Sequence, residues 1–347
     1  MKKFVGYSIS IALGVCLFYL AMRDVDTSEL LAALKNAAYG WLIPIVATIF
    51  IGHGLRAWRW QILIEALPDH QRTGELNTIS FKNTFMALLI GYFANILVPR
   101  LGEFARAASL SKQEGIRFSG VFGTVVAERV FDVIVLLLGI ASLSVLFYDQ
   151  FLFLQDRVLL PLLSLSQDIS IGWTAFGLAG FTAVGYITLR SMKASQSSKL
   201  MQFRRRLISV IKSFKDGLFT LLTAPKRVIL IVSTILMWLS YAAMAYLMFI
   251  MLDMDSNYDL GFAAAWSIMI FGAIGFAVPS PAGTGSFHYF TILALVNLYF
   301  IDDPTAAAYA LLSHGLHVLV YIIAGIAALF IQGTNLKSLQ ATPIDTD

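Results

Sequence analysis

Apolar residues along this chain gather in runs of about twenty, and polar stretches separate one run from the next. A helix needs about 20 apolar residues to cross the hydrocarbon core of a bilayer. The pattern therefore predicts six full membrane spans, at residues 4–22, 41–64, 119–147, 171–190, 228–252 and 305–331. Two further apolar regions are interrupted: 83–110 breaks at Pro99 and Gly102, and 261–301 breaks at the stretch VPSPAGTGSF.

The composition supports a membrane protein. Of the 347 residues, 58% are hydrophobic and 13% are charged, and the mean hydropathy is +0.75, whereas soluble domains carry about 25% charged residues. We therefore predict an all-α polytopic membrane protein, with one transmembrane domain at 1–333 and a short cytoplasmic tail at 334–347. The single cysteine, Cys16, excludes internal disulfides and thiolate metal sites, and we expect neither a metal nor a cofactor.

The first apolar run follows two lysines, as in a signal peptide. At about 19 residues it is longer than the usual apolar core of about 7–15, and no small-residue cleavage site follows it. We interpret it as an uncleaved first span.

The distribution of lysine and arginine predicts which loops are cytoplasmic. Residues 190–227, which include an amphipathic segment at 191–226, hold ten basic residues against one acidic residue, Asp216. This loop and the N-terminus, with Lys2 and Lys3, are expected in the cytoplasm. The crossings between them must be even in number, and four of the predicted spans already supply them. Region 83–110 is therefore expected to enter from the cytoplasm and return there as a re-entrant hairpin.

The order of the predicted elements repeats. Span, span, hairpin, span describes residues 1–150 and again residues 168–333, and the second half is inverted relative to the first. The Val98-Pro99 and Val278-Pro279 steps fall in corresponding breaks. In transporters with inverted repeats, interrupted helices at matching positions mark a substrate site near the bilayer midplane. Two full spans remain an alternative to the second hairpin at 261–301.

Charged residues follow the first break at helical spacing. Arg100, Glu103 and Arg106 are three apart, so they share one face of a helix and can pair. Asn95 precedes the break by one turn and can satisfy backbone groups that the break frees. Because the planar fork of arginine suits phosphate, we interpret this region as an anion-binding mouth. The alternative is an ordinary cytoplasmic turn whose arginines reach lipid head groups.

Three charges interrupt the predicted span 119–147: Glu128, Arg129 and Asp132. A charge at the bilayer centre costs about 2.5–3.5 kcal/mol on insertion scales. We therefore expect these side chains to face the interior of the helix bundle, either at a ligand site or as an internal ion-pair clamp.

The second predicted span ends in the stretch LRAWRWQIL. Arg56 and Arg59 share a face near its cytoplasmic end, where they either contact lipid phosphate or serve as positively charged flanking residues. Trp58 and Trp60 are typical of the aromatic belt at a membrane surface.

The second break carries no charge. Its helix-breaking residues are Pro279, Pro281, Gly283 and Gly285, and a helix that starts after them presents N–H groups suited to an anion. An ordinary loop between two spans is the alternative. His288 follows the break, and His314 and His317 lie on the last span. Without a nearby acidic motif we interpret these histidines as buried and hydrogen-bonded rather than as a metal site or proton relay.

Four motifs, LRAWRWQILI, GYFANILVPRLGEFAR, AERVFDVIVLLLG and PSPAGTGSF, occur in this order. Together they resemble the lysylphosphatidylglycerol synthase transmembrane-region family, over about residues 10–330. The resemblance implies an inner-membrane protein that moves or holds lipids with charged or glycosylated head groups, without the soluble aminoacyl-transferase domain of bifunctional members. Family members usually carry a glutamate where this chain has His288. The family pattern covers Arg56, Arg59, Asn95, Pro99, Gly102, Glu103, Arg106, Glu128, Arg129, Asp132, Pro279, Pro281, Gly283 and Gly285.

We therefore expect translocation of an anionic or glycosylated lipid in the bacterial inner membrane, by a transporter rather than an enzyme, with both termini cytoplasmic. The expected partners are membrane lipids and not nucleic acid; a homo-oligomer and a separate lipid-modifying enzyme remain open. One rival is a membrane-embedded transferase that uses a lipid-linked donor, suggested by Asp24 and Asp26 after the first span. The other is a lipid-binding scaffold that transports nothing.

Overall fold

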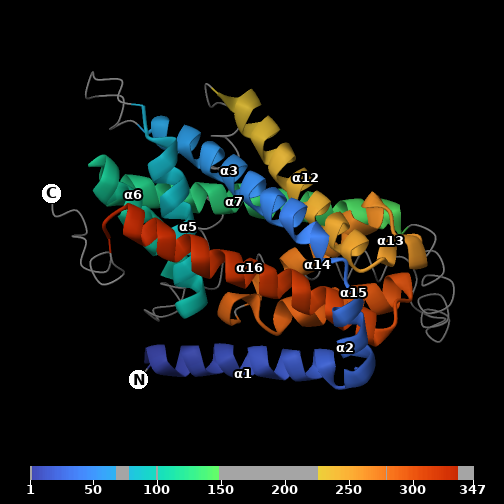
Figure 1. Cartoon of the computed structure of the whole chain (residues 1–347). Coiled ribbons are helices and arrows are strands. Elements are labelled where there is room, and N and C mark those ends of the chain that lie inside the picture. The colour runs from blue at the N-terminus through green and yellow to red at the C-terminus, as the bar shows by residue number, and fades with distance from the viewer. Residues whose placement is uncertain (1, 68–77, 99–100, 148–225, 279, 335–347) are drawn as a thin grey trace, which may run out of the picture. The chain divides into compact units, whose positions relative to one another are not determined.

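The computed structural model describes residues 2–67, 78–98, 101–147, 226–278 and 280–334, and the regular elements of these ranges are helices (Figure 1). They are α1 (Lys2–Met22), α2 (Thr27–Asn36), η1 (Tyr39–Trp41), α3 (Leu42–Glu65), α5 (Phe81–Leu97), α6 (Leu101–Glu114), α7 (Phe118–Leu146), α12 (Arg227–Met251), α13 (Met254–Asn257), α14 (Phe262–Ala277), η3 (Pro281–Gly283), α15 (Ser286–Tyr299) and α16 (Asp303–Ile331).

The chain forms two compact units, one of Met1–Arg129 with Thr223–Asp347 and the other of Val130–Leu222. The described part of the smaller unit is the second part of α7 with Phe147. The other helices belong to the larger unit.

Three helical stretches of the described residues are long and apolar enough to cross a membrane: Tyr39–Glu65, Arg227–Met251 and Asp303–Ile331. They coincide with the predicted spans 41–64, 228–252 and 305–331. The helices α1 and α7 cover the predicted spans 4–22 and 119–147. The all-helical, multi-pass architecture is confirmed. The predicted span 171–190 and residues 191–225 lie outside the described residues, so the number of six spans stays a prediction.

Small residues let the longest helices of the larger unit approach closely. A methyl group at Gly52 of α3 would lie 2.7 Å from the Ser240 hydroxyl of α12, so a larger residue would push these helices apart. Where α12 meets α16, the Phe249 ring packs on Tyr309, with ring centroids 5.2 Å apart. Both rings are buried in the main apolar core. This core joins α3, α12 and α16, and the two interrupted regions pack against these helices.

The first interrupted region is an antiparallel helical hairpin of α5 and α6. The α5 helix ends at Leu97, and Val98 is extended, with φ −142° and ψ 122°, because the residue before a proline is forced out of the helical region. A methyl group at Gly102 would overlap the Gly91 carbonyl oxygen, so the two arms touch backbone to backbone. Pro99 and Arg100 themselves lie outside the described residues.

The second interrupted region has the same construction. The α14 helix ends at Ala277, Val278 is again extended with φ −69° and ψ 133°, and α15 returns along α14. Gly285, at φ 86°, adopts a conformation that favours glycine, and a side chain there would overlap the backbone of Gly14 in α1. The second break is thus seated directly on the first helix. Pro279 lies outside the described residues.

The four hairpin arms are short. They contain 17 residues in α5, 14 in α6, 16 in α14 and 14 in α15, whereas a full crossing needs about 20. The short helix η3 of the second break packs against both α5 and α1, so the second break lies beside the arm that leads into the first.

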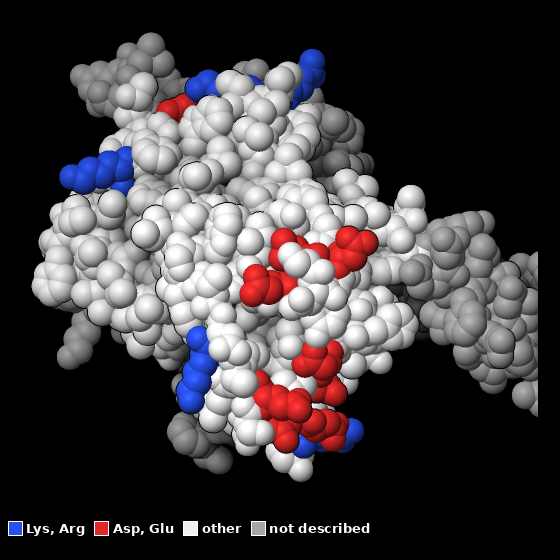
Figure 2. Space-filling view, turned by 45° about the vertical axis from the view of Figure 1, so that its right-hand side comes forward, with Lys and Arg blue, Asp and Glu red and all other residues white. Residues whose placement is uncertain are grey.

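Acidic residues gather on one face of the larger unit, as Figure 2 shows. They belong to the segments after α1, α12 and α15, namely Asp24, Asp26, Glu29, Asp253, Asp255, Asp259, Asp302 and Asp303. Where the sequence predicted only an acidic loop after the first span, the structure contains the helix α2. Asp26 caps this helix, and bonds from the Ser28 hydroxyl and from the N–H groups of Glu29 and Ser28 lower its pKa.

Candidate functional site

A single buried carboxylate holds three arginines together. Glu128 of α7 has no exposed surface. Its Oε1 accepts from Arg56 Nε at 2.6 Å and from Arg59 Nη2 at 3.2 Å, and its Oε2 accepts from Arg106 Nη1 at 2.7 Å. Four residues that the sequence singled out from three different motifs therefore form one arginine cluster: Arg56, Arg59, Arg106 and Glu128.

Helix geometry explains how the arginine cluster assembles. Arg56 and Arg59 are three residues apart on α3, so they lie on the same face of that helix and both reach Glu128 of α7. Arg106 reaches Glu128 from α6. All three guanidinium groups are buried, with Arg59 at 0% and Arg106 at 2% exposure. Arg59 also donates from Nη1 to the Thr234 hydroxyl of α12 at 3.3 Å. The two arginines on α3 are thus interior residues, and the alternative of exposed positive flanks is wrong for them.

Trp60 is part of the same arrangement. Its indole N–H donates to the Thr124 hydroxyl at 2.9 Å, and the Arg106 guanidinium carbon lies 4.7 Å from the centre of its ring. This is a cation–π contact in a buried setting. The prediction of an aromatic-belt role is wrong for Trp60, which is fully buried, while Trp58 is 38% exposed.

All three arginines of the cluster pair with one carboxylate, that of Glu128. In addition, Nε and Nη2 of Arg106 are buried and make no hydrogen bond to any residue that the structure describes. A buried donor without a partner costs about 1–3 kcal/mol, and more when it is charged. These two nitrogens of Arg106 are therefore available to donate hydrogen bonds to an anion.

The first break opens beside Arg106. Asn95 Oδ1 accepts from the backbone N–H of Gly102 at 2.7 Å, which confirms that Asn95 satisfies a group freed by the break. Glu103 pairs with Arg129 Nη2 at 2.9 Å. A cavity of about 10 Å³, enough for about one water, is lined by Leu88, Gly91, Tyr92, Asn95, Gly102, Glu103, Arg106 and Arg129. The break is therefore polar on its inner side.

The pairing expected along α6 is replaced by pairing between helices. Glu103 and Arg106 share a face of α6 as the spacing predicts, but their ion pairs are with Arg129 and Glu128 of α7. The charges thereby fasten the α5–α6 hairpin to α7. Asp132 lies on α7, in the smaller unit, and is half-buried, and its role at a ligand site stays a prediction, as does the position of Arg100.

The second break forms a separate, uncharged group. Gly285 donates its N–H to His288 Nδ1 at 3.3 Å, so the histidine caps the start of α15. His314 Nε2 lies 3.0 Å from the Ala282 carbonyl oxygen, and the rings of the two histidines are 4.7 Å apart. His317 Nδ1 lies 2.8 Å from the Ser313 carbonyl oxygen. His288 and His314 are buried and His317 is half-buried, and each makes a hydrogen-bonding contact, as predicted.

The other residues of the second break shape its backbone. Pro281 begins η3, and Gly283 has φ 79°, which favours glycine. A side chain at Gly283 would also overlap the Phe276 ring. Ser280 and Ser286 join across the break through their hydroxyls at 2.7 Å. These contacts make the second break a compact, hydrogen-bonded turn.

The sequence analysis did not identify His53, which is 3% exposed. Its ring lies 4.6 Å from Tyr92 and 5.4 Å from Tyr321, and the two tyrosines stack on each other at 4.6 Å. Both ring nitrogens lack a hydrogen-bond partner within the described part of the chain. An apolar run surrounds this residue in the sequence, so only its one-turn spacing from Arg56 could have indicated it.

The acidic stretch that suggested a transferase has other roles in the structure. Asp24 pairs with its neighbour Arg23 at 2.9 Å in an exposed position, and Asp26 caps α2.

Comparison with known proteins places this site in a family. The family model described as "Lysylphosphatidylglycerol synthase TM region" matches residues 7–325, which include all the residues of the arginine cluster and both breaks. The chain belongs to this family. A relative named "UPF0104 membrane protein MJ1595", from Methanocaldococcus jannaschii, is 33% identical over 126 residues. That match covers 35% of this chain and 35% of the relative, so it spans about a third of the relative's length. No solved structure matches the chain.

The contact of His288 with Gly285 has the geometry of a capping box. At the third position of a helix, a glutamate accepts from the N-cap backbone N–H, and His288 Nδ1 accepts from Gly285 in the same way. The histidine therefore supplies the acceptor that a glutamate would supply at this position.

Proposed function

We propose that the protein translocates an anionic or glycosylated lipid between the leaflets of the bacterial inner membrane, with both termini in the cytoplasm. The observation that carries the proposal is the arginine cluster, in which three buried guanidinium groups all pair with the buried carboxylate of Glu128. Ionisable residues within membrane helices are costly and mark substrate pathways in transport proteins.

Phosphate is the ligand that suits this arrangement best. Guanidinium groups bind phosphate oxygens through two parallel N–H donors, and Arg106 has two buried donor nitrogens that bond to no described residue. A phosphate that arrived at Arg106 could compete with Glu128 for the three arginines. Such an exchange of partners would hold the head group while the ion pairs to α7 loosen.

The two hairpins support passage through the middle of the membrane. Their arms are too short for full crossings, and the even number of crossings required by the lysine and arginine bias favours a return to the starting side. Broken helices from two inverted halves that meet near the midplane are the usual substrate site of transporters built from such repeats.

Head-group passage requires this site to open. The cavity at the first break holds about one water, and α5 and α6 touch backbone to backbone at Gly91 and Gly102. We therefore expect the two arms to move together, and the ion pairs that such a movement would break are those to α7, Arg106 with Glu128 and Glu103 with Arg129.

Leaflet exchange of a fluorescent phosphatidylglycerol in vesicles reconstituted with the purified chain tests the proposal. We expect the protein to accelerate exchange and Arg106→Ala to slow it about tenfold or more, because a charge-assisted hydrogen bond contributes about 1.5–3 kcal/mol. Arg23→Ala, an exposed arginine on the acidic face, serves as the matched control with unchanged exchange. Thermal unfolding of both variants shows that each is folded.

The rival functions predict other results. If no lipid of an anionic and glycosylated panel exchanges faster with protein than without it, translocation is wrong. Lipid that still co-purifies in that case identifies a scaffold. Formation of a new glycolipid by the purified chain identifies a transferase.

A further inference from the structure

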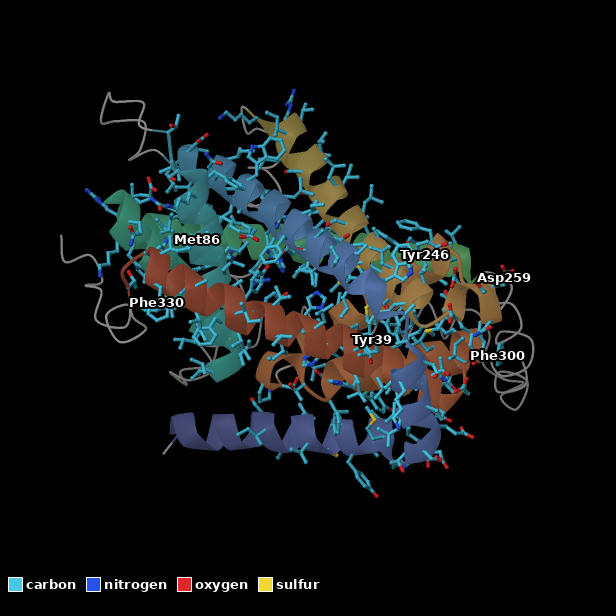
Figure 3. All side chains as sticks on the ribbon, viewed as in Figure 1. Tyr39, Met86, Tyr246, Asp259, Phe300 and Phe330 are labelled. Atoms are coloured by element: carbon cyan, nitrogen blue, oxygen red, sulfur yellow. The ribbon has the colours of Figure 1, made fainter. Side chains whose placement is uncertain are left out.

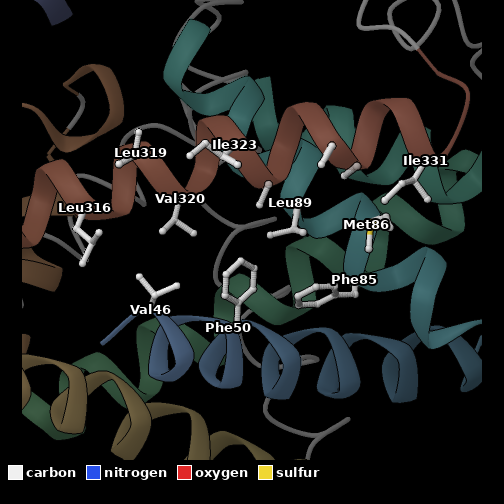
Figure 4. A pocket seen from close by; sticks show the side chains of 13 residues that line it. Val46, Phe50, Phe85, Met86, Leu89, Leu316, Leu319, Val320, Ile323 and Ile331 are labelled. Atoms are coloured by element: carbon white, nitrogen blue, oxygen red, sulfur yellow. The ribbon is translucent and has the colours of Figure 1, made fainter. Parts of the chain in front are cut away.

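A large apolar groove lies on a different face of α5 from the arginine cluster. Its volume is about 440 Å³. In Figure 4, Val46 and Phe50 rise from α3, Leu316 and Val320 descend from α16, and α5 closes the back. Every residue of the lining has an aliphatic, aromatic or thioether side chain: Val46, Phe50, Phe85, Met86, Leu89, Leu316, Leu319, Val320, Ile323, Ala324, Ala327, Ala328 and Ile331.

This groove opens outward rather than forming a closed core. Phe50 is 37% exposed, Leu319 is 52% exposed and Ile323 is 62% exposed. An apolar surface of this kind at the outside of a membrane helix bundle contacts hydrocarbon. The helices cannot close the gap by sliding together, because α5 and α16 already meet at Gly325, where a methyl group would overlap Phe93.

The length of the groove fits one acyl chain. Leu316 and Ile331 mark its two ends on α16, and the fifteen helical steps between them span about 22 Å. One leaflet contributes about half of the roughly 30 Å hydrocarbon core. The groove is therefore long enough to take a lipid tail along its length.

A lysine lies at one end of this apolar surface. Lys82, Phe85, Met86 and Leu89 follow the spacing that places residues on one face of a helix, and Lys82 comes first. Lys82 is exposed and forms no ion pair within the part of the chain that the structure describes. In Figure 3, Met86 lies toward Phe330, at the end of the unit opposite to Asp259 and Phe300. The lysine end is thus away from the acidic face.

We propose that this groove is a binding site for one acyl chain of an anionic phospholipid, with the lipid phosphate at Lys82. The site goes beyond the proposed function, because it holds a lipid whether or not the arginine cluster moves one. Leu89 and Met86 line the groove, whereas Leu88, Gly91 and Tyr92 line the polar cavity on another face of α5. Occupancy can therefore be tested apart from transport.

Photolabelling of the full chain in nanodiscs tests the tail position. The probe is phosphatidylglycerol with a diazirine in one acyl chain, and labelled peptides are identified by mass spectrometry. We expect labelling to concentrate on the groove residues of α3, α5 and α16. Ala327→Trp should fill the groove and abolish this labelling, while Ile326→Trp, at the neighbouring exposed position outside the lining, should leave it unchanged.

A second probe tests the head group. The same diazirine on phosphatidylcholine should label the groove about fivefold less, because one basic residue near the surface contributes roughly that factor for an anionic lipid. Lys82→Gln should remove the preference, and Lys112→Gln, an exposed lysine on α6 that is not on the α5 face leading into the groove, should keep it.

Three results would overturn the proposal. One is labelling spread evenly over all lipid-facing helices, which indicates annular lipid only. Another is labelling that survives Ala327→Trp. The third is crosslinking of two copies of the chain through the groove, which would make it a protein interface. Loss of leaflet exchange in the vesicle assay has no bearing on these readouts, so the two proposals fail separately.

Discussion

At the residue scale, the arginine cluster shows what sequence spacing can and cannot predict. The individual charges could be found, because an arginine or glutamate inside an apolar run is conspicuous. Their partners could not, because Glu128 lies 72 residues from Arg56 and 69 from Arg59 along the chain. Local spacing pointed to pairing of Glu103 with Arg106 along α6, and packing against α7 gave each of them a closer partner.

Removing the shared carboxylate should be the most damaging single change to the site. In Glu128→Ala three buried guanidinium groups lose their common partner, and breaking a buried ion pair from one side costs about 3–5 kcal/mol. We expect the free energy of unfolding to fall by that amount in a denaturant titration of the purified protein in detergent.

The matched control for Glu128→Ala is Glu103→Ala on the neighbouring helix. The Glu103 side chain is 26% exposed and its partner Arg129 is 42% exposed, so the loss should be about 1 kcal/mol or less. If the two variants lowered the free energy of unfolding equally, the shared pairing of Glu128 with three arginines would contribute no extra stability.

At the scale of elements, the two breaks were predictable because proline acts locally. Each valine before a proline is extended, and the preceding helix ends one residue earlier. Trp60 and α2 were not predictable in this way. A tryptophan near a span end is usually interfacial, and only the packing of α6 and α7 around α3 buries this one; the acidic residues around Asp26 masked a short capped helix.

The contact of the two arms in the first hairpin should depend on glycine. Gly102→Ala places a methyl group on the Gly91 carbonyl oxygen, and forcing the arms apart should lower the free energy of unfolding by about 1–3 kcal/mol. Gly123→Ala in α7, where a methyl group meets nothing within 4 Å, should be neutral or gain up to about 1 kcal/mol. Thermal unfolding of both variants in detergent measures the difference.

At the scale of the whole molecule, the lysine and arginine bias predicts a membrane orientation, and the structure shows where the acidic segments gather. Acidic segments that lie far apart in sequence gather on one face of the larger unit, and the Tyr258 hydroxyl donates to Asp302 to join two of them. The inverted repeat is only partly visible, because the predicted span 171–190 lies outside the described residues. The side on which each hairpin enters therefore stays a prediction of charge and parity.

Cysteine accessibility in a Cys16→Ser background tests that orientation. We expect Lys112→Cys to react with a membrane-impermeant maleimide only from the cytoplasm, and Ser256→Cys only from outside. Both positions are exposed, whereas Ser111 is 8% exposed and donates to the Ile116 carbonyl oxygen, so it would report poorly. Reaction of Lys112→Cys from outside would contradict the re-entrant path of residues 83–110, because a single crossing there would place position 112 on the outer side.

The burial of Trp60 gives the protein an intrinsic optical reporter. Its indole touches Thr124 of α7 on one edge and Arg106 of α6 on its face, so its fluorescence depends on whether those two helices stay together. The difference between the emission spectra of the native chain and of Trp60→Phe isolates this single fluorophore. A shift in that difference spectrum on adding lipid would follow the separation of the hairpin in real time, without any attached dye.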